Sequence, residues 1–355
     1  MDTEDIVASL NTLIETSKDG EYGYIRLNKV LQDGAAAKWT FVQPDGGPKT
    51  DRSVVRIDLP RPVAPGTTTN FDIDFFNQLP RVVARTGYYG SFHLVAQWFP
   101  KIGVLELPGE RGATAPRWNA HEFHLHSEFF ADFGSYDVRI TVPKGYTVGA
   151  TGALTGAPAE RGGKVTHRYV QHDVHDFAWT ADPTYRIGET TWNGVQCIAI
   201  AQENNAAGWQ QTAQFTAKVI ATYSRDFGMY NYPKIVCADA ADGMEYPMIT
   251  MDGGLYPSHQ GLIAHEVGHN WFFGMIGSNE TYRAALDEGF TQFLTAWCMR
   301  KLTKENQPEL KRAFSGYMED AIDGTDESLE THSNEFHSAT GHGGGYKHVY
   351  YKTAS

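Results

Sequence analysis

The chain of 355 residues has little positive charge, few cysteines and no long apolar run. Its 30 Lys and Arg stand against 42 Asp and Glu, which gives a formal net charge of −12. Neither nucleic acid nor an anionic membrane is therefore expected as a main partner. The three cysteines, Cys197, Cys237 and Cys298, lie far apart, so the sequence indicates neither a disulfide framework nor a Cys-rich zinc site. No stretch approaches the roughly 18 apolar residues of a membrane-spanning helix.

The first twenty residues are acidic and lack the apolar segment of a signal peptide. We therefore expect a cytoplasmic protein if Met1 is the natural start of the chain. If the chain is a fragment, its N-terminus says nothing about the compartment.

What is present is typical of a globular protein: 41% of the residues are hydrophobic and 13% are aromatic. Short alternating runs at 54–59, 71–75, 136–142 and 195–201 are separated by Gly, Pro and Asp turns. This pattern predicts strands of an antiparallel sandwich or saddle-shaped sheet. The length predicts two domains, and we assign residues 1–203 to an N-terminal β domain.

From residue 204 the apolar residues recur every three or four positions, which is typical of helices. We expect helices at 209–227, 260–276, 281–301 and 304–322, with a short strand at 234–238. The polar and Gly-rich stretch 323–348 reads as a long loop. The sequence therefore predicts an α+β protein in which residues 204–355 form an α-rich second domain.

One motif in the second domain carries chemistry: His265-Glu266-Val267-Gly268-His269, an HExxH pattern. Positions i and i+4 lie on one face of a helix, so both imidazoles can reach one metal ion. Glu266 can then act beside the metal as a general base. The alternative is a helix with two surface histidines.

A catalytic zinc takes three protein ligands and keeps one position open. Glu288 follows His269 by 19 residues at the start of the next expected helix, so a helix–turn–helix can return its carboxylate to the same metal. We predict one Zn²⁺ per chain on His265, His269 and Glu288. The competing interpretation is that Asp287 and Glu288 only supply negative charge at a helix N-terminus.

The motifs GMEYP at 243–247, HEVGHNWFFGMIGSNE and DEGF together resemble the gluzincin zinc aminopeptidases of the aminopeptidase N and leukotriene hydrolase type. The resemblance covers roughly residues 55–355, and Tyr246 in place of Asn is typical of a bacterial branch. It implies a thermolysin-like catalytic domain after the β domain. It also implies that Glu245 binds the free α-ammonium of a peptide, while the backbone of Gly243 and Met244 lines the substrate like an added strand. The alternative is a plain loop with a solvated Glu245.

The segment HVYYKTAS resembles the Y-x-K-G segment of this family, which implies a catalytic role for Tyr350 as a donor to the oxyanion. Thr353 stands where Gly is usual. Tyr351 is the adjacent alternative, and Tyr346 is a weaker one. The family's catalytic domain continues well beyond this tyrosine, so we expect a fragment, a truncated product or a minimal member.

Three functions remain in play. The first is a zinc aminopeptidase that acts on peptides with a free N-terminus, with Glu266 as the base. The second is a thermolysin-type zinc endopeptidase, but the GMEYP motif argues against it. The third is a zinc-holding scaffold without catalysis, although a scaffold has no need of Glu266.

Overall fold

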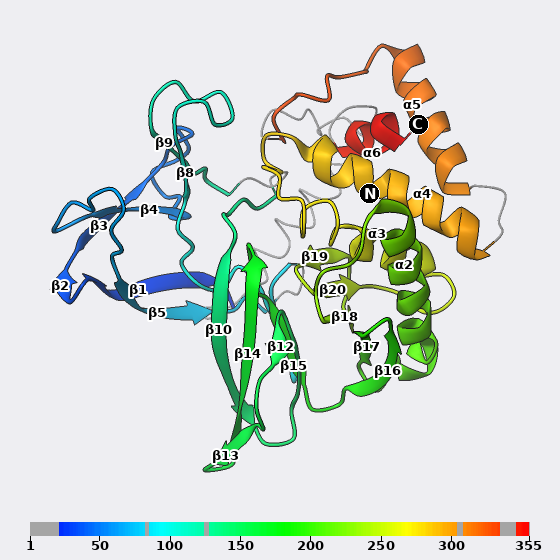
Figure 1. Cartoon of the computed structure of the whole chain (residues 1–355), viewed down its shortest axis with the longest axis horizontal. Coiled ribbons are helices and arrows are strands. Elements are labelled where there is room, and N and C mark those ends of the chain that lie inside the picture. Colours follow the sequence, from blue (N-terminus) through cyan, green and yellow to red (C-terminus); the bar gives the residue numbers. More distant parts are fainter. Residues whose placement is uncertain (1–20, 82–84, 124–127, 304–307, 334–345, 355) are drawn as a thin grey trace.

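The computed structural model describes residues 21–81, 85–123, 128–303, 308–333 and 346–354. Antiparallel sheets make up the N-terminal part, and helices dominate the C-terminal part (Figure 1). The predicted α+β class is confirmed. All three cysteines are buried and unpaired, as their spacing indicated. Within the described residues, no helix is long and apolar enough to cross a membrane.

All four alternating runs form strands: 54–59, 71–75 and 136–142 lie in the N-terminal sheets, and 195–201 lies in the mixed sheet described below. For example, β10 alternates between exposed and more buried residues, because successive side chains of a strand point to opposite faces. The sheets have the orders β2-β1-β5, β10-β14-β12 with β13 on β14, β11-β15-β7-β6, β3-β4 and β8-β9. Their bounds are β1 (Tyr24–Gln32), β2 (Ala35–Ala36), β3 (Lys38–Val42), β4 (Val54–Asp58), β5 (Phe71–Gln78), β6 (Gly87–Tyr89), β7 (Phe92–Val95), β8 (Val104–Glu106), β9 (Arg117–Asn119), β10 (Gly134–Pro143), β11 (Thr147–Ala150), β12 (Ala153–Leu154), β13 (Ala159–Arg161), β14 (Lys164–Val174) and β15 (Trp179–Asp182).

A mixed five-stranded sheet supports the helices. Its order is β16-β17-β18-β20-β19, formed by β16 (Arg186–Trp192), β17 (Val195–Ala201), β18 (Lys234–Asp239), β19 (Met244–Tyr246) and β20 (Ile249–Asp252). The strand expected at 234–238 is β18. Because β16 and β17 precede residue 203 and pair into this sheet, we propose that the second domain begins before β16.

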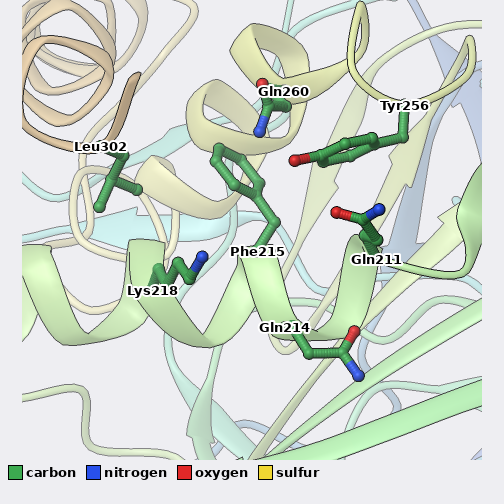
Figure 2. A pocket seen from close by; sticks show the side chains of 7 residues that line it. All are labelled: Gln211, Gln214, Phe215, Lys218, Tyr256, Gln260 and Leu302. Atoms are coloured by element: carbon green, nitrogen blue, oxygen red, sulfur yellow. The ribbon is translucent and has the colours of Figure 1, made fainter. Parts of the chain in front are cut away.

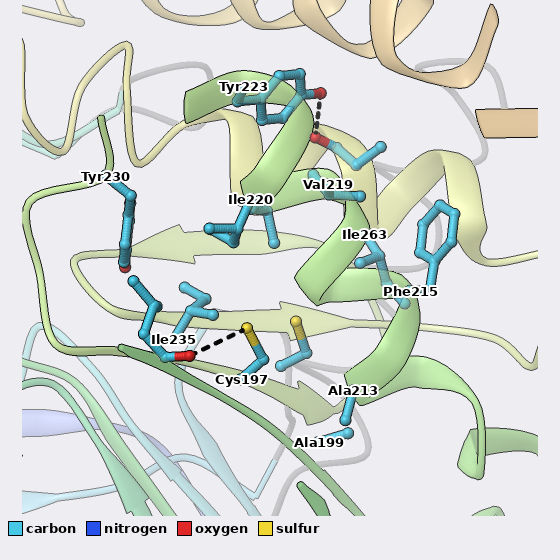
Figure 3. Close-up of a cluster of buried hydrophobic side chains, with 14 of the residues drawn as sticks. Cys197, Ala199, Ala213, Phe215, Val219, Ile220, Tyr223, Tyr230, Ile235 and Ile263 are labelled. Carbon is cyan, nitrogen blue, oxygen red and sulfur yellow. Dashed lines mark hydrogen bonds between the residues drawn. The ribbon is translucent and has the colours of Figure 1, made fainter. Parts of the chain in front are cut away.

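The main core lies between this sheet and the helices α2 (Thr212–Phe227) and α3 (Gln260–Gly268). Val219, Ile220 and Tyr223 of α2 belong to this core, and Figure 3 shows Ile220 on the side of α2 that faces the strands. The hydroxyl of Tyr223 donates to the carbonyl of Ala264 at 2.8 Å, which ties α2 to α3. Fully burying a side chain such as Ile220 contributes about 1.5–3 kcal/mol, so this packing fixes where α3 lies.

Two helix predictions were wrong in their bounds. The helix expected at 260–276 ends at Gly268, and the helix expected at 281–301 begins as a π-helical turn. The loop expected at 323–348 gives way to a helix at residue 346, while residues 334–345 lie outside the described chain. The remaining helical segments are η1 (Ala206–Trp209), η2 (Ala285–Gly289, the π-helical turn), α4 (Phe290–Thr303), α5 (Pro308–Asp323) and α6 (Tyr346–Ala354).

Candidate metal centre

The three expected metal ligands meet at one point. His265 lies on α3, His269 follows directly after its last residue, and Glu288 lies on the π-helical turn η2. The Nε2 atoms of the two histidines are 3.2 Å apart. Oε2 of Glu288 lies 3.0 Å from Nε2 of His265 and 3.2 Å from Nε2 of His269. The structure therefore brings together all three side chains that the spacing predicted.

These distances fit a zinc ion. A tetrahedral zinc with ligand distances of about 2.0–2.1 Å has ligand atoms roughly 3.3 Å apart, close to the separations of 3.0 to 3.2 Å here. Two imidazole nitrogens and one carboxylate oxygen are also the donor set of many catalytic zinc sites. The three side chains are largely buried, so the site has a dry surrounding. His265, His269 and Glu288 therefore suit a zinc ion.

Each histidine is oriented through its second ring nitrogen. Nδ1 of His269 lies 2.5 Å from Oδ1 of Asp287, and Nδ1 of His265 lies 3.2 Å from the hydroxyl of Thr295. Such contacts fix the ring and leave Nε2 free for a metal. Thr291 is a further neighbour of His269, with its hydroxyl 3.3 Å from Nδ1. The sequence interpretation missed these supporting roles, although Thr291 and Thr295 follow Glu288 at helical spacing.

Burial and the two neighbouring histidines have opposite effects on the pKa of Glu288. Burial alone raises the pKa of this carboxyl, but the neighbouring imidazoles His269 and His265 outweigh it, and the net pKa is lowered. Glu288 therefore stays ionised, as a carboxylate ligand must.

Glu266 lies on α3 directly after His265 and is 5% exposed. Its Oε2 atom has no hydrogen-bond partner in the described part of the chain. Burial, and next the negative charge of Glu245, raise the pKa of the Glu266 carboxyl well above its usual range. A buried carboxyl with a free oxygen and a raised pKa can accept and return a proton.

Glu245 lies on β19, which pairs with β20 alone among the described strands and is thus an edge of the sheet. The side chain is 5% exposed, and its Oε1 atom finds no hydrogen-bond partner within the described residues. One oxygen of Glu245 lies within 4.8 Å of ligand atoms of His269, Asp287 and Glu288. The solvated-loop interpretation of this residue is therefore wrong, because Glu245 is buried beside the metal ligands.

A second group of carboxylates adjoins the first and was missed by the sequence interpretation. Glu128, Glu245 and Glu280 each bring an oxygen within 4.8 Å of the others. Arg85 pairs with both carboxylate oxygens of Glu128, through Nη1 to Oε2 and through Nη2 to Oε1 at 2.7 Å. The stretch SEFF at 127–130 and the stretch SNE at 278–280 offered no metal-ligand spacing, so only the fold could bring them to Glu245.

Tyr350 and Tyr351 of α6 have different surroundings. The ring of Tyr350 lies 5.7 Å from the ring of His265, whereas Tyr351 packs against Gly316 of α5, where an added Cβ would come within 2.2 Å of its ring. Burial, together with the adjacent carboxylate of Glu288, raises the pKa of the Tyr350 phenol well above its usual range. Tyr350 thus stays a protonated donor beside the metal ligands.

A separate pocket of about 210 Å³ lies between α2, the start of α3 and the end of α4 (Figure 2). Polar side chains line most of it, and none of the metal-centre residues takes part. The lining residues are Gln211, Gln214, Phe215, Lys218, Tyr256, Gln260 and Leu302. This pocket is therefore distinct from the candidate metal centre.

The fold of the chain is similar to that of known zinc metallopeptidases. The structure is similar to the crystal structure of an M1 zinc metallopeptidase from Deinococcus radiodurans, with a TM-score of 0.63 and 20% identity over 93% of this chain and 71% of that chain. The chain has the M1 metallopeptidase fold. A mutant of that peptidase matches with a TM-score of 0.64 and 18% identity, and the same mutant bound to a Tyr-Ser-Ala substrate matches with 0.60 and 17%, each with the same coverage. No protein-family model and no curated protein sequence matches the chain.

Proposed function

We propose that the protein is a zinc-dependent aminopeptidase, and the observation that carries this proposal is the position of Glu245. A buried carboxylate beside the metal ligands can bind the ammonium of a peptide at a fixed distance from the reacting carbonyl. This would make the first peptide bond the one that lies at the metal centre. An endopeptidase has no use for such a buried negative charge.

His265, His269 and Glu288 would hold the zinc ion. When bound, zinc supplies Lewis acidity, which lowers the pKa of water and polarises a carbonyl oxygen. Asp287 and Thr295 would keep the two imidazoles in the tautomer that presents Nε2.

Glu266 would move the protons. Its free Oε2 atom accepts a proton from the attacking water, and the carboxyl then returns a proton to the leaving amine. The buried surrounding raises its pKa and so favours the protonated state between the two steps.

Tyr350 and the edge strand β19 would orient the substrate. The protonated phenol of Tyr350 donates a hydrogen bond to the oxyanion that forms at the scissile carbonyl. The backbone of Gly243 and Met244, at the open edge of the sheet, pairs with the extended peptide as a further strand would.

The shared fold supports this proposal, and the peptide substrate named for the Deinococcus radiodurans mutant agrees with it. The likeness concerns fold, so the choice between aminopeptidase and endopeptidase rests on this chain's own Glu245.

A paired assay tests the proposal. The protein is incubated with a leucyl fluorogenic amide and with its N-acetylated form, and zinc is measured on the same sample. We expect about one zinc per chain, cleavage of the free amide and no detectable cleavage of the acetylated one. Glu266→Gln should keep the zinc and lose hydrolysis, because the base is not a ligand. Equal cleavage of both amides would favour an endopeptidase, and zinc without cleavage of either would favour a scaffold.

A further inference from the structure

The group formed by Glu128, Glu245 and Glu280 holds more negative charge than the proposed mechanism uses. These residues are 5%, 5% and 0% exposed. Arg85 accounts for the charge of Glu128 through its two contacts. The Oε1 atoms of Glu245 and Glu280, in contrast, have no hydrogen-bond partner among the residues that the structure describes.

Glu280 is held in place, but it forms no ion pair with a positive side chain among the described residues. Its Oε2 atom accepts a hydrogen bond from the backbone N–H of Phe129 at 3.3 Å, which is a weak and uncharged contact. Burying a carboxylate in this way is unfavourable unless a positive group pairs with it. The arrangement is therefore suited to a cation that brings several hydrogen-bond donors at once.

We propose that Glu280 joins Glu245 and Glu128 in a three-acceptor site that selects a primary ammonium group at the N-terminus of the substrate. This inference rests on the proposed function, and it adds to it both a residue and a selectivity. A primary ammonium has three N–H donors. Three acceptors placed about 2.8 Å from its nitrogen along tetrahedral directions are roughly 4.6 Å apart. The three carboxylate oxygens here lie no more than 4.8 Å from one another, which leaves room for that arrangement.

The selectivity follows from counting donors. An N-methylated terminus or an N-terminal proline keeps only two N–H groups on its charged nitrogen. One carboxylate oxygen would then face a carbon atom and stay unpaired in a buried place, which is costly. Peptides with a secondary amine at the N-terminus should therefore bind poorly, whatever their side chain.

A second metal ion is the competing occupant. The guanidinium of Arg85, which lies on Glu128, adds a positive charge to the group and so disfavours a divalent cation there. Metal content is nevertheless one outcome of the test.

The test measures binding without hydrolysis. L-Leucinol carries a primary ammonium and no amide bond, and N-methyl-L-leucinol differs by one methyl group. Calorimetric titration of the zinc-loaded protein should show leucinol binding at least about 10-fold more tightly than its N-methyl form. In Glu280→Gln the affinity for leucinol should fall about 10-fold, while that for N-methyl-leucinol changes little, so the selectivity is lost.

Glu122→Gln is the matched control. Glu122 is 2% exposed, and its two oxygens accept from the backbone N–H groups of Asp45 and Gly47 at 2.7 and 3.0 Å. It belongs to none of the carboxylate groups around Glu245. This variant should keep the full selectivity for leucinol. The ligand-free Glu280→Gln protein should also melt at the same temperature as the parent or higher, because it no longer buries an unpaired carboxylate.

The outcomes that overturn the inference differ from those that overturn the proposed function. Unchanged selectivity in Glu280→Gln would show that Glu280 does not bind the amine. A second equivalent of zinc or manganese that is lost in this variant would assign the group to a metal. Selective leucinol binding by a protein that cleaves no peptide would leave this inference standing and refute only the peptidase.

Discussion

Gly243 lies directly against the carboxylate of Glu266. A Cβ atom built on Gly243 would be 2.2 Å from Oε1 of Glu266 and 2.8 Å from Cδ1 of Leu262. The loop before β19 can therefore approach α3 only because residue 243 has no side chain. The first residue of the GMEYP segment thus sets the position of the proposed base.

Gly243→Ala should therefore reduce activity without removing the metal. Both atoms that the new methyl group meets are ends of flexible side chains, so the carboxylate of Glu266 moves while the fold persists. A displacement of about 1 Å in a reacting group costs on the order of 100-fold in rate. We expect turnover to fall by about that factor at unchanged zinc content. Gly188→Ala on β16, where a Cβ meets nothing within 4 Å, should leave turnover unchanged. Full activity of Gly243→Ala would mean that Glu266 is not the base.

Asp287→Asn should weaken metal binding although Asp287 is not itself one of the three ligands. The carboxylate contacts Nδ1 of His269 at 2.5 Å and so makes this imidazole a better ligand through Nε2. Losing such a contact typically lowers metal affinity 10- to 100-fold. Competition with a chromogenic chelator measures this directly. Thr303→Val is the control, because Thr303 lies at the far end of α4, the helix that follows η2, and its hydroxyl donates to the carbonyl of Met299. Equal zinc affinities in Asp287→Asn and the parent would show that Asp287 does not support His269 and only supplies negative charge at a helix N-terminus.

The ligands could be predicted from the sequence because their geometry is local. His265 and His269 are one helical turn apart, and Glu288 follows after a length of chain that fits one turn and a second helix. The carboxylates Glu128 and Glu280 carried no comparable signal. Glu128 comes from the N-terminal β domain and Glu280 from the segment before η2, and both lie near Glu245 only in the folded chain. Their spacing along the sequence gives no sign of this contact.

The end of α3 shows why helix bounds were harder to predict. The apolar residues Trp271, Phe272, Phe273, Met275 and Ile276 continue the helical pattern. After His269, however, the backbone hydrogen bonds no longer join residues four apart. The N–H groups of Gly274 and Met275 donate to the carbonyls five residues earlier, those of His269 and Asn270. The side chain of Asn270 accepts from Met248 N–H at 3.0 Å, so a tertiary contact ends the helix. The periodicity of apolar residues in the sequence gives no information about such tertiary contacts.

Tyr350→Phe should keep zinc and substrate binding but lower turnover by roughly two to three orders of magnitude, the usual scale for one oxyanion donor. The ring of Phe still fits beside His265, so only the hydroxyl is lost. Steady-state kinetics should show a reduced kcat at a similar KM. Tyr351→Phe keeps its packing on Gly316 and should behave as the parent. A loss of turnover in Tyr351→Phe alone would shift the catalytic role to that tyrosine.

Lys234 gives the protein a pH-dependent stability that is independent of the metal centre. This lysine is 7% exposed at the start of β18, and its ammonium donates to the carbonyl of Ala150 at 2.8 Å and lies 4.9 Å from the ring centroid of Tyr169. Burial lowers its pKa from 10.5 to about 7. Above pH 7 the folded protein has therefore released a proton that the unfolded chain keeps until about pH 10.5. Stability then rises with pH across this window, because the unfolded state binds more protons.

Lys234→Met should remove this dependence, since methionine fills a similar volume without a charge. Below pH 7 both states of the parent are charged, and the folded state bears the whole cost of burying the ammonium. From pH 6 to pH 9 we expect the parent to gain roughly 2–3 kcal/mol in its free energy of unfolding relative to Lys234→Met. Urea titrations of both proteins at several pH values measure the difference. Lys144→Met removes the same charge from a side chain that is 64% exposed, and it should follow the parent. Parallel curves for the parent and Lys234→Met would show that the buried ammonium keeps its proton at pH 9.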